Sequence, residues 1–248
     1  MSGYFEFARF YDILTSNIPY SDRATYYDEL IQHHGGKVGG ILLDLACGTG
    51  SMSIELEHLG YDVIGVDSSP NMLTVASSKK SEGSNIIYLC QDMRQLDLFG
   101  GVDITICALD GFNHIVDEND LARVFKRINM FTNPDGLLIF DVNTIHKHRN
   151  ILGNNTFVLD YDEVYCVWNN SYNEEDNTVD INLDIFEYMD GCYYRHEESF
   201  KERAYSEELL DRMLKDAGFR LESKYDLDLF GPAHEGSEKI VYVVRKER

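Results

Sequence analysis

Short apolar runs alternate with helix-like segments through the first part of the chain. Five runs of five or six residues have the composition of buried strands: Ile41–Leu45, Asp62–Val66, Ile86–Cys90, Asp103–Cys107 and Leu137–Val142. The segments between them repeat apolar residues every three or four positions, which is the spacing of an amphipathic helix. Strands of this kind joined by helices are typical of a parallel sheet covered on both faces. The pattern therefore predicts an α/β fold.

The period changes after Asn143, where apolar side chains begin to alternate with polar ones. The clearest alternation consists of Val179, Ile181, Leu183 and Ile185. A two-residue period is that of an antiparallel strand with one buried face. Thr156–Asn169 and Tyr193–Tyr205 are also strand-like, and Asp190-Gly191 is a typical hairpin turn. We therefore predict a small antiparallel β insertion after the fifth strand.

The end of the chain returns to the helix–strand pattern. Ser206 is the expected N-cap of an amphipathic helix that ends at Gly218. Phe219–Phe230 and Lys239–Arg245 follow as two strand-like runs. We expect these elements to complete the main domain.

Acidic side chains outnumber basic ones by 43 to 22 in the 248 residues, so the formal net charge is −21. Residues 151–208 carry −12 of it. Such a surface repels phosphate groups, which argues against nucleic-acid and membrane partners. The N-terminal residues lack the basic and apolar regions of a signal peptide, and no uncharged apolar run is long enough to span a bilayer. We expect a cytoplasmic globular protein.

Metal binding is not predicted. The five cysteines are far apart and form no Cys-x-x-Cys pair, as expected of reduced thiols. His146-Lys147-His148-Arg149 holds two residues that can ligate a metal, but no third ligand follows at a suitable spacing. We interpret this segment as a solvated loop.

Candidate chemistry lies where the first two strands end. Asp44 to Gly50 read Asp-Leu-Ala-Cys-Gly-Thr-Gly, and glycines there let a backbone approach a ligand and present N–H groups at a helix N-terminus. Asp67 ends the second strand, where an acid can hold ribose hydroxyls, although it could also serve only as a helix cap. Ser53 replaces the third glycine of the dinucleotide-binding fingerprint, which weakens an NAD interpretation.

Three motifs lie at the ends of successive predicted strands: Leu43–Gly50, Gly65–Leu73 and Cys90–Met93. In this order they resemble the class I S-adenosylmethionine (SAM)-dependent methyltransferases, and residues 38–142 carry most of the likeness. Phe7–Asp12 is similar to the opening of small bacterial members. Sugar-amine and glycine N-methyltransferase types likewise carry a β insertion after the fifth strand.

The resemblance implies a Rossmann-like sheet of seven strands with the last one antiparallel. Residues 1–150 would form an N-terminal lid and the SAM-binding core. Residues 151–205 would be an acidic β insertion on the substrate side, and residues 206–248 would complete the core.

The resemblance also implies roles for individual residues. Asp44 would anchor the glycine loop or reach the ammonium group of SAM, and Asp67 would accept hydrogen bonds from the ribose hydroxyls. Asp92 would take the adenine amino group, Met72 would pack on the adenine, and the Met93 backbone N–H would meet a ring nitrogen. The set implied to bind SAM, or its product S-adenosylhomocysteine, is Asp44, Ala46, Cys47, Gly48, Gly50, Asp67, Ser68, Met72, Gln91, Asp92, Met93, Leu109, Tyr11 and Tyr20. Tyr4 would lie in the same lid.

His114 is the candidate base, because it follows the fourth predicted strand and a nucleophile that must lose a proton benefits from a positioned base. A structural role for His114 in its loop is the alternative. Four aromatic residues of the insertion form either a small β core or a cage for a cationic amine: Trp168, Tyr172, Tyr193 and Tyr194.

The predicted function is methyl transfer from SAM to a small-molecule acceptor by in-line displacement. One alternative is a SAM-binding sensor or scaffold of the same fold without catalysis. The other is an NAD(P)-dependent oxidoreductase, for which the glycine fingerprint is incomplete.

Overall fold

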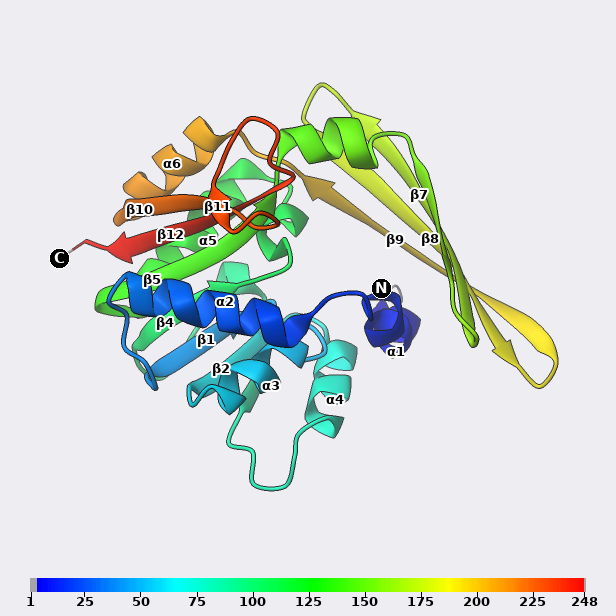
Figure 1. Ribbon diagram of the computed structural model, residues 1–248, viewed down its shortest axis with the longest axis horizontal. Helices are drawn as coiled ribbons and strands as arrows, with labels where there is room; N and C mark the ends of the chain where they lie inside the picture. The colour runs from blue at the N-terminus through cyan, green and yellow to red at the C-terminus, as the bar shows by residue number, and fades with distance from the viewer. Residues whose placement is uncertain (1–3, 248) are drawn as a thin grey trace.

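The computed structural model describes residues 4–247, with side chains from Phe7 onward. The chain forms a large sheet with helices on both faces and a smaller sheet that projects from one end (Figure 1). The strands of the large sheet are β1 (Ile41–Leu45), β2 (Asp62–Asp67), β3 (Ile87–Cys90), β4 (Val102–Cys107), β5 (Thr132–Asn143), β10 (Phe219–Asp226), β11 (Gly231–Pro232) and β12 (Lys239–Lys246). Their spatial order is β11-β10-β12-β5-β4-β1-β2-β3. The predicted fold class is confirmed.

The five strands predicted from the apolar runs pair in parallel, and β12 is antiparallel to β5. The described sheet has one strand more than the expected seven, because β11 adds a two-residue pairing at its edge, too short to leave a sequence period. Strand β5 begins at Thr132, five residues before the apolar run Leu137–Val142 that predicted it. Asp135 has a φ of +64°, and the register between β4 and β5 shifts there, so the strand kinks without ending.

Six α-helices lie within the described residues: α1 (Tyr4–Leu14), α2 (Tyr20–His33), α3 (Ser51–His58), α4 (Pro70–Ser78), α5 (Glu118–Phe131) and α6 (Glu207–Asp216). Helices α2 and α3 cover one face of the large sheet through Tyr27, Ile31 and Leu56. Helices α5 and α6 cover the other through Phe125 and Leu214. None of the helices in the described range is long and apolar enough to cross a membrane.

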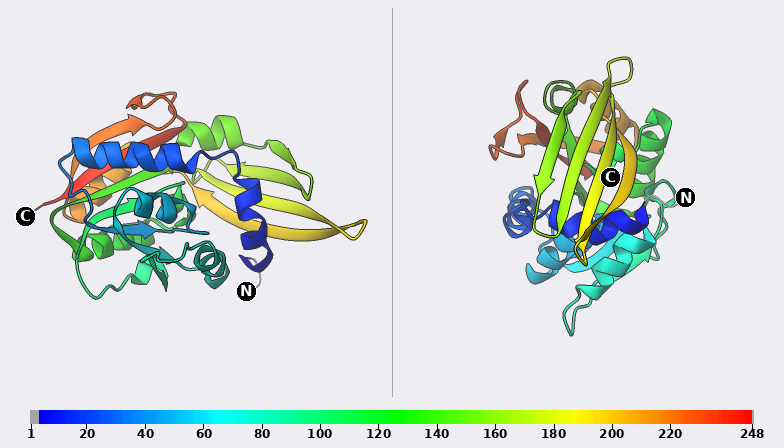
Figure 2. Two further views of the ribbon diagram at one scale, coloured as in Figure 1. Left: turned by 60° about the horizontal axis from the view of Figure 1, so that its bottom comes forward. Right: turned by 90° about the vertical axis from the view of Figure 1, so that its right-hand side faces the viewer.

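The insertion is an antiparallel sheet of β6 (Thr156–Asp160), β7 (Val164–Asn173), β8 (Thr178–Met189) and β9 (Cys192–Arg203), in that spatial order. Asp190-Gly191 forms the predicted turn of the long β8–β9 hairpin. The strand-like stretch 156–169 proves to be a hairpin, because Tyr161 and Val164 exchange backbone hydrogen bonds. Phe10 of α1 packs on the apolar face of this sheet, so α1 lies between the insertion and the core (Figure 2).

Candidate active site

A cavity of about 730 Å³ lies at the carboxyl ends of β1, β2 and β4 and reaches under α1 to the insertion. The strand order reverses between β1 and β4, since β2 and β3 extend the sheet one way and β5 the other. In an open α/β sheet, loops separate at such a reversal and leave a crevice for a ligand. The volume is within the range of small-molecule sites, roughly 300–1,000 Å³.

The glycine loop after β1 is held open by Asp67. The Asp67 carboxylate at the end of β2 accepts the Gly48 N–H at 2.9 Å and the Ser69 N–H at 2.8 Å. Ala46 and Gly48 both have left-handed backbones, with φ of +61° and +53°. A Cβ on Gly48 would meet nothing within 4 Å, so the backbone faces open space there. One carboxylate thus orients the loops that follow two neighbouring strands.

Gly50 closes this loop and is the N-cap residue of α3. Its φ is +74°, and a Cβ there would collide with the Tyr88 hydroxyl, so glycine is required for both conformation and space. Gly50 does not line the cavity, whereas the other thirteen residues implied to bind SAM do. Its contribution is to the shape of the loop.

Asp44 lies beneath the loop and is almost fully buried. Its carboxylate accepts a hydrogen bond from the Ser53 hydroxyl at 2.5 Å. Burial raises the pKa of Asp44 to about 6; the bond from Ser53 opposes this shift, and the charge of Asp67 adds to it. Burial also raises the pKa of Asp67, against the pull of its bonds from Ser69 and Gly48. Both carboxylates therefore favour a positively charged ligand group nearby.

The loop after β4 is shaped by a carboxylate that the sequence analysis missed. Leu109 and Asp110 take consecutive left-handed conformations, with φ of +57° and +58°. Asp141 on β5 accepts their N–H groups at 2.7 and 3.0 Å, and also the Tyr27 hydroxyl at 2.6 Å. Lys239 on β12 donates to Asp110 at 2.6 Å. The available signal was an aspartate inside an apolar run, Leu137–Val142, where a charge needs a structural reason.

Helix α1 is fastened over the glycine loop by an ion pair. Asp12 accepts the Thr49 hydroxyl at 2.5 Å and the Lys79 ammonium at 2.7 Å, which ties α1 to both the loop and the end of α4. Tyr11 and Tyr20 line the cavity beneath this tie, and burial raises the pKa of both phenols. The side chain of Tyr4 lies outside the described residues.

The segment after β3 forms a third wall, with Gln91, Asp92 and Met93 at the cavity. Asp92 caps the short turn η1 (Met93–Gln95) and is bound by the Arg94 guanidinium at 2.9 and 3.0 Å. That hydrogen bonding lowers the pKa of Asp92. Gln91 turns its amide to the backbone of Asp97, so it supports the wall.

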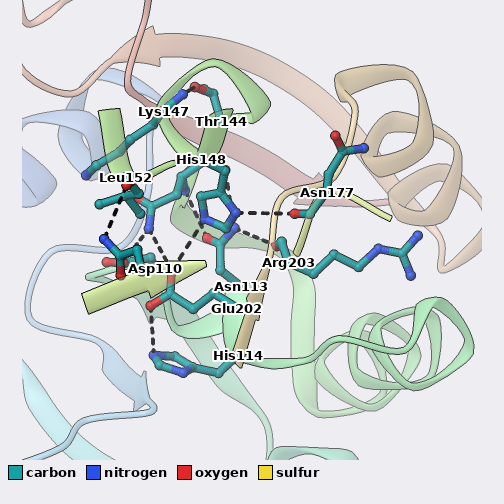
Figure 3. A network of polar contacts seen from close by, with 12 residues as sticks. Asp110, Asn113, His114, Thr144, Lys147, His148, Leu152, Asn177, Glu202 and Arg203 are labelled. Atoms are coloured by element: carbon teal, nitrogen blue, oxygen red, sulfur yellow. Dashed lines mark hydrogen bonds and ion pairs between the residues drawn. The ribbon is translucent and has the colours of Figure 1, made fainter. Parts of the chain in front are cut away.

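The far end of the cavity lies against the insertion. His114, at the end of the short turn η2 (Gly111–His114), lines it and has a half-exposed side chain. Glu202 of β9 lines it too, with a side chain only 7% exposed, and was not singled out from the sequence. A single carboxylate on an amphipathic strand carries no distinguishing local signal. Figure 3 shows Glu202 between His114 and His148.

The aromatic residues singled out in the insertion do not lie together in the structure. Trp168 lines the cavity and donates its indole N–H to Asn170 at 2.6 Å. Tyr193 and Tyr194 are exposed near the tip of the β8–β9 hairpin, where they belong to neither a β core nor the cavity wall. The solvated loop expected over 146–149 is wrong, because Lys147–Leu152 forms a π-helical turn, η3, that buries His148 completely.

The strand order, the glycine loop after β1 and the acid ending β2 define a nucleoside-binding α/β protein. A family model described as a methyltransferase domain matches residues 42–136. YqeM of Bacillus subtilis (strain 168), provisionally assigned as a methyltransferase, is 33% identical over 216 residues, covering 87% of this chain and 85% of that protein. The chain belongs to the class I SAM-dependent methyltransferases.

A solved structure and a second relative are also similar. The crystal structure of a SAM-dependent methyltransferase from Clostridium acetobutylicum ATCC 824 superposes with a TM-score of 0.89 at 31% identity, covering 99% of both chains. A glycine/sarcosine N-methyltransferase of Parasynechococcus marenigrum (strain WH8102) is 33% identical over 128 residues, which is 50% of this chain and 42% of that protein.

Proposed function

We propose that this methyltransferase acts on a small-molecule acceptor bound under α1, between the carboxyl edge of the large sheet and the insertion. The observation that carries the proposal is the continuity of the cavity, because the glycine loop, Trp168 and Glu202 all line the same cavity. The net charge of −21 disfavours a nucleic-acid acceptor. The cavity volume of about 730 Å³ favours a compound smaller than a folded protein.

The walls near β1 to β3 suit SAM. The open backbone at Gly48 offers space for the amino-acid part, and the Asp67 carboxylate retains acceptor capacity for two ribose hydroxyls. Met72 and Met93 offer an apolar surface to the adenine, with Asp92 beside them for its amino group. The remaining proposed contacts are Asp44, Ala46, Cys47, Ser68, Gln91, Leu109, Tyr11 and Tyr20. When bound, SAM supplies a methyl group on a positively charged sulfur.

The chain's own contribution to the reaction is alignment. The loops held by Asp67 and Asp141 are fixed before ligand arrives, so neither has to be ordered during the reaction. Helix α1, tied down by Asp12, covers the glycine loop. The leaving group is neutral, so its departure needs no acid. The proton that must be removed is the one on the acceptor.

The test follows the label from methyl-labelled SAM into a panel of small amines and hydroxyl compounds, with RNA and bulk protein as competing acceptors. Glycine and sarcosine are tested first, because the chain is similar to a glycine/sarcosine N-methyltransferase. Label in a small-molecule product supports the proposal. Label only in RNA or protein contradicts it, and bound SAM without any transfer favours the sensor alternative.

SAM affinity is expected to rise by about tenfold between pH 5 and pH 7, as Asp44 ionises. The pKa of Asp44 is about 6 in the protein alone, so most of this carboxyl is protonated at pH 5. A ligand ammonium near it favours the charged form, and binding at low pH must drive off that proton. Calorimetric titrations across this range measure the slope, and Asp44→Asn should flatten it. An unchanged slope in the variant would exclude Asp44 as the partner.

A further inference from the structure

Glu202 differs in its ion-pair partners from three other carboxylates that line the cavity. Asp110 is paired with Lys239 at 2.6 Å, and Asp92 and Asp120 are paired with Arg94. Burial alone would raise the pKa of Asp110, but the charges of Lys239 and Lys147 outweigh it and lower that pKa. Across the described residues, the ion-pair partners of Glu202 are two histidines. Glu202 is therefore a wall carboxylate whose ion-pair partners are histidines and not lysine or arginine.

His148 faces Glu202, and its surroundings determine which of its ring nitrogens carries a proton. The ring is completely buried, and its Nδ1 lies 3.3 Å from the backbone carbonyl of Asn177. A carbonyl oxygen only accepts, so Nδ1 carries a proton. The other ring nitrogen, Nε2, lies 3.4 Å from Oε2 of Glu202 and has no hydrogen-bond partner among the described residues (Figure 3).

This geometry favours a proton shared between the two side chains. If His148 were neutral and Glu202 ionised, the lone pair on Nε2 would face a carboxylate oxygen inside the protein, where an unpaired polar group is costly. A proton between Nε2 and Oε2 removes the conflict, whichever atom holds it. Asn143 fixes the same oxygen by donating its amide to Oε2 at 3.1 Å while also donating to Asp110 at 2.6 Å.

The second oxygen of Glu202 is directed to the cavity side. Oε1 lies 3.8 Å from Nε2 of His114, which is the half-exposed residue predicted as the base. A proton taken up by Oε1 therefore has a neighbour through which it can reach solvent. The Phe200 ring lies 5.3 Å from the His114 ring and covers one side of this path.

We propose that Glu202, backed by the proton it shares with His148, takes the proton of the methyl acceptor; the role rests on the function proposed above. With the shared proton on Nε2 of His148, Glu202 is a carboxylate and can accept another proton. As the nucleophilic atom of the acceptor bonds to the methyl carbon and the carbon–sulfur bond breaks, the proton on the nucleophile passes to Oε1 of Glu202. It then passes to Nε2 of His114 and leaves to solvent, which restores the starting state. His148 acts through Glu202 and is a positioning residue.

Several charged groups face this pair and would contribute to its titration. They are His114 and Asp110 from η2 and its N-terminal cap, Lys147 from η3 and Lys239 from β12. Burial and the charge of Lys239 lower the pKa of Lys147. The pH profiles are therefore compared only between variants that keep all of these charged groups.

The kinetic test compares Glu202→Gln with Glu198→Gln. Glu198 lies on the same strand, is also buried and does not line the cavity, so it is a matched control. Glu202→Gln should lower kcat by about 100-fold while the Kd for SAM stays within about twofold. It should also remove the rising limb of kcat against pH, which His148→Gln should only displace. Glu198→Gln should retain the wild-type kcat and pH profile.

A wild-type kcat and pH profile in a folded Glu202→Gln protein would overturn the proposal. Melting curves establish folding, and Glu202→Asp, which keeps the carboxyl group, should recover part of the activity if the fold is intact.

Nitrogen-15 NMR of histidine-labelled protein detects the proton shared by His148 and Glu202, and it needs no methyl acceptor. His148, assigned by its loss in His148→Gln, should show a protonated Nδ1 and an Nε2 resonance that moves in Glu202→Gln but not in Glu198→Gln. An Nε2 resonance indifferent to Glu202→Gln would overturn the shared proton. If the wild-type protein binds SAM but methylates no compound of the panel, the proposed function fails, and with it the role of the pair in turnover. The NMR result then still decides the shared proton.

Discussion

Replacing Asp67 with alanine is expected to weaken SAM binding by about 300-fold, which corresponds to about 3–4 kcal/mol. The carboxylate now receives the N–H groups of Gly48 and Ser69, and the same oxygens are proposed to receive two ribose hydroxyls. Its loss removes charge-assisted bonds to the ligand and also frees the loops after β1 and β2. Binding therefore suffers both from missing contacts and from the entropy of ordering two loops.

Isothermal titration of SAM into Asp67→Ala measures this loss. Asp62→Ala is the matched control, because Asp62 begins the same strand, is exposed and is remote from the cavity lining. It should bind SAM as the wild type does. Asp67→Asn should fall between the two, since it keeps one carbonyl oxygen but not the charge. A Kd for Asp67→Ala within tenfold of wild type would show that the ribose is held elsewhere.

Local patterns in the sequence account for most of the core. Each of the five apolar runs became a strand, and the residues that end them lie at one edge of the sheet because parallel strands share a direction. That geometry alone brings Asp44, Asp67 and Asp92 to one cavity, although they are distant in the chain. The helix cap Ser206 was also readable, since a cap depends on its own neighbours.

The parts that were not predicted depend on contacts between remote segments. Asp141 looks like an interruption of an apolar run until Leu109 and Asp110 present their N–H groups to it, 32 and 31 residues away in sequence. His148 is buried only because η3 packs against the insertion, and Glu202 meets it from 54 residues further on. Nothing within either segment distinguishes these side chains from solvated ones.

Asp141→Ala is expected to destabilise the protein by about 3–5 kcal/mol and to abolish methyl transfer even where the protein remains folded. The side chain is 1% exposed, and its removal leaves two backbone N–H groups and the Tyr27 hydroxyl without their acceptor. The consecutive left-handed residues Leu109 and Asp110 then lose the bonds that offset their backbone strain, so the loop beside the methyl donor relaxes.

Thermal unfolding measures the first effect, with a fall in Tm of about 10 °C expected for a chain of this size. Label transfer at a temperature well below the lowered Tm measures the second. Tyr27→Phe is the graded control, because it removes one of the three donors to Asp141 and leaves the carboxylate in place. It should cost about 1 kcal/mol and retain transfer. If Asp141→Ala were no less stable than Tyr27→Phe, the loop after β4 would have to be held by the Lys239–Asp110 pair instead, since that ion pair survives in both variants.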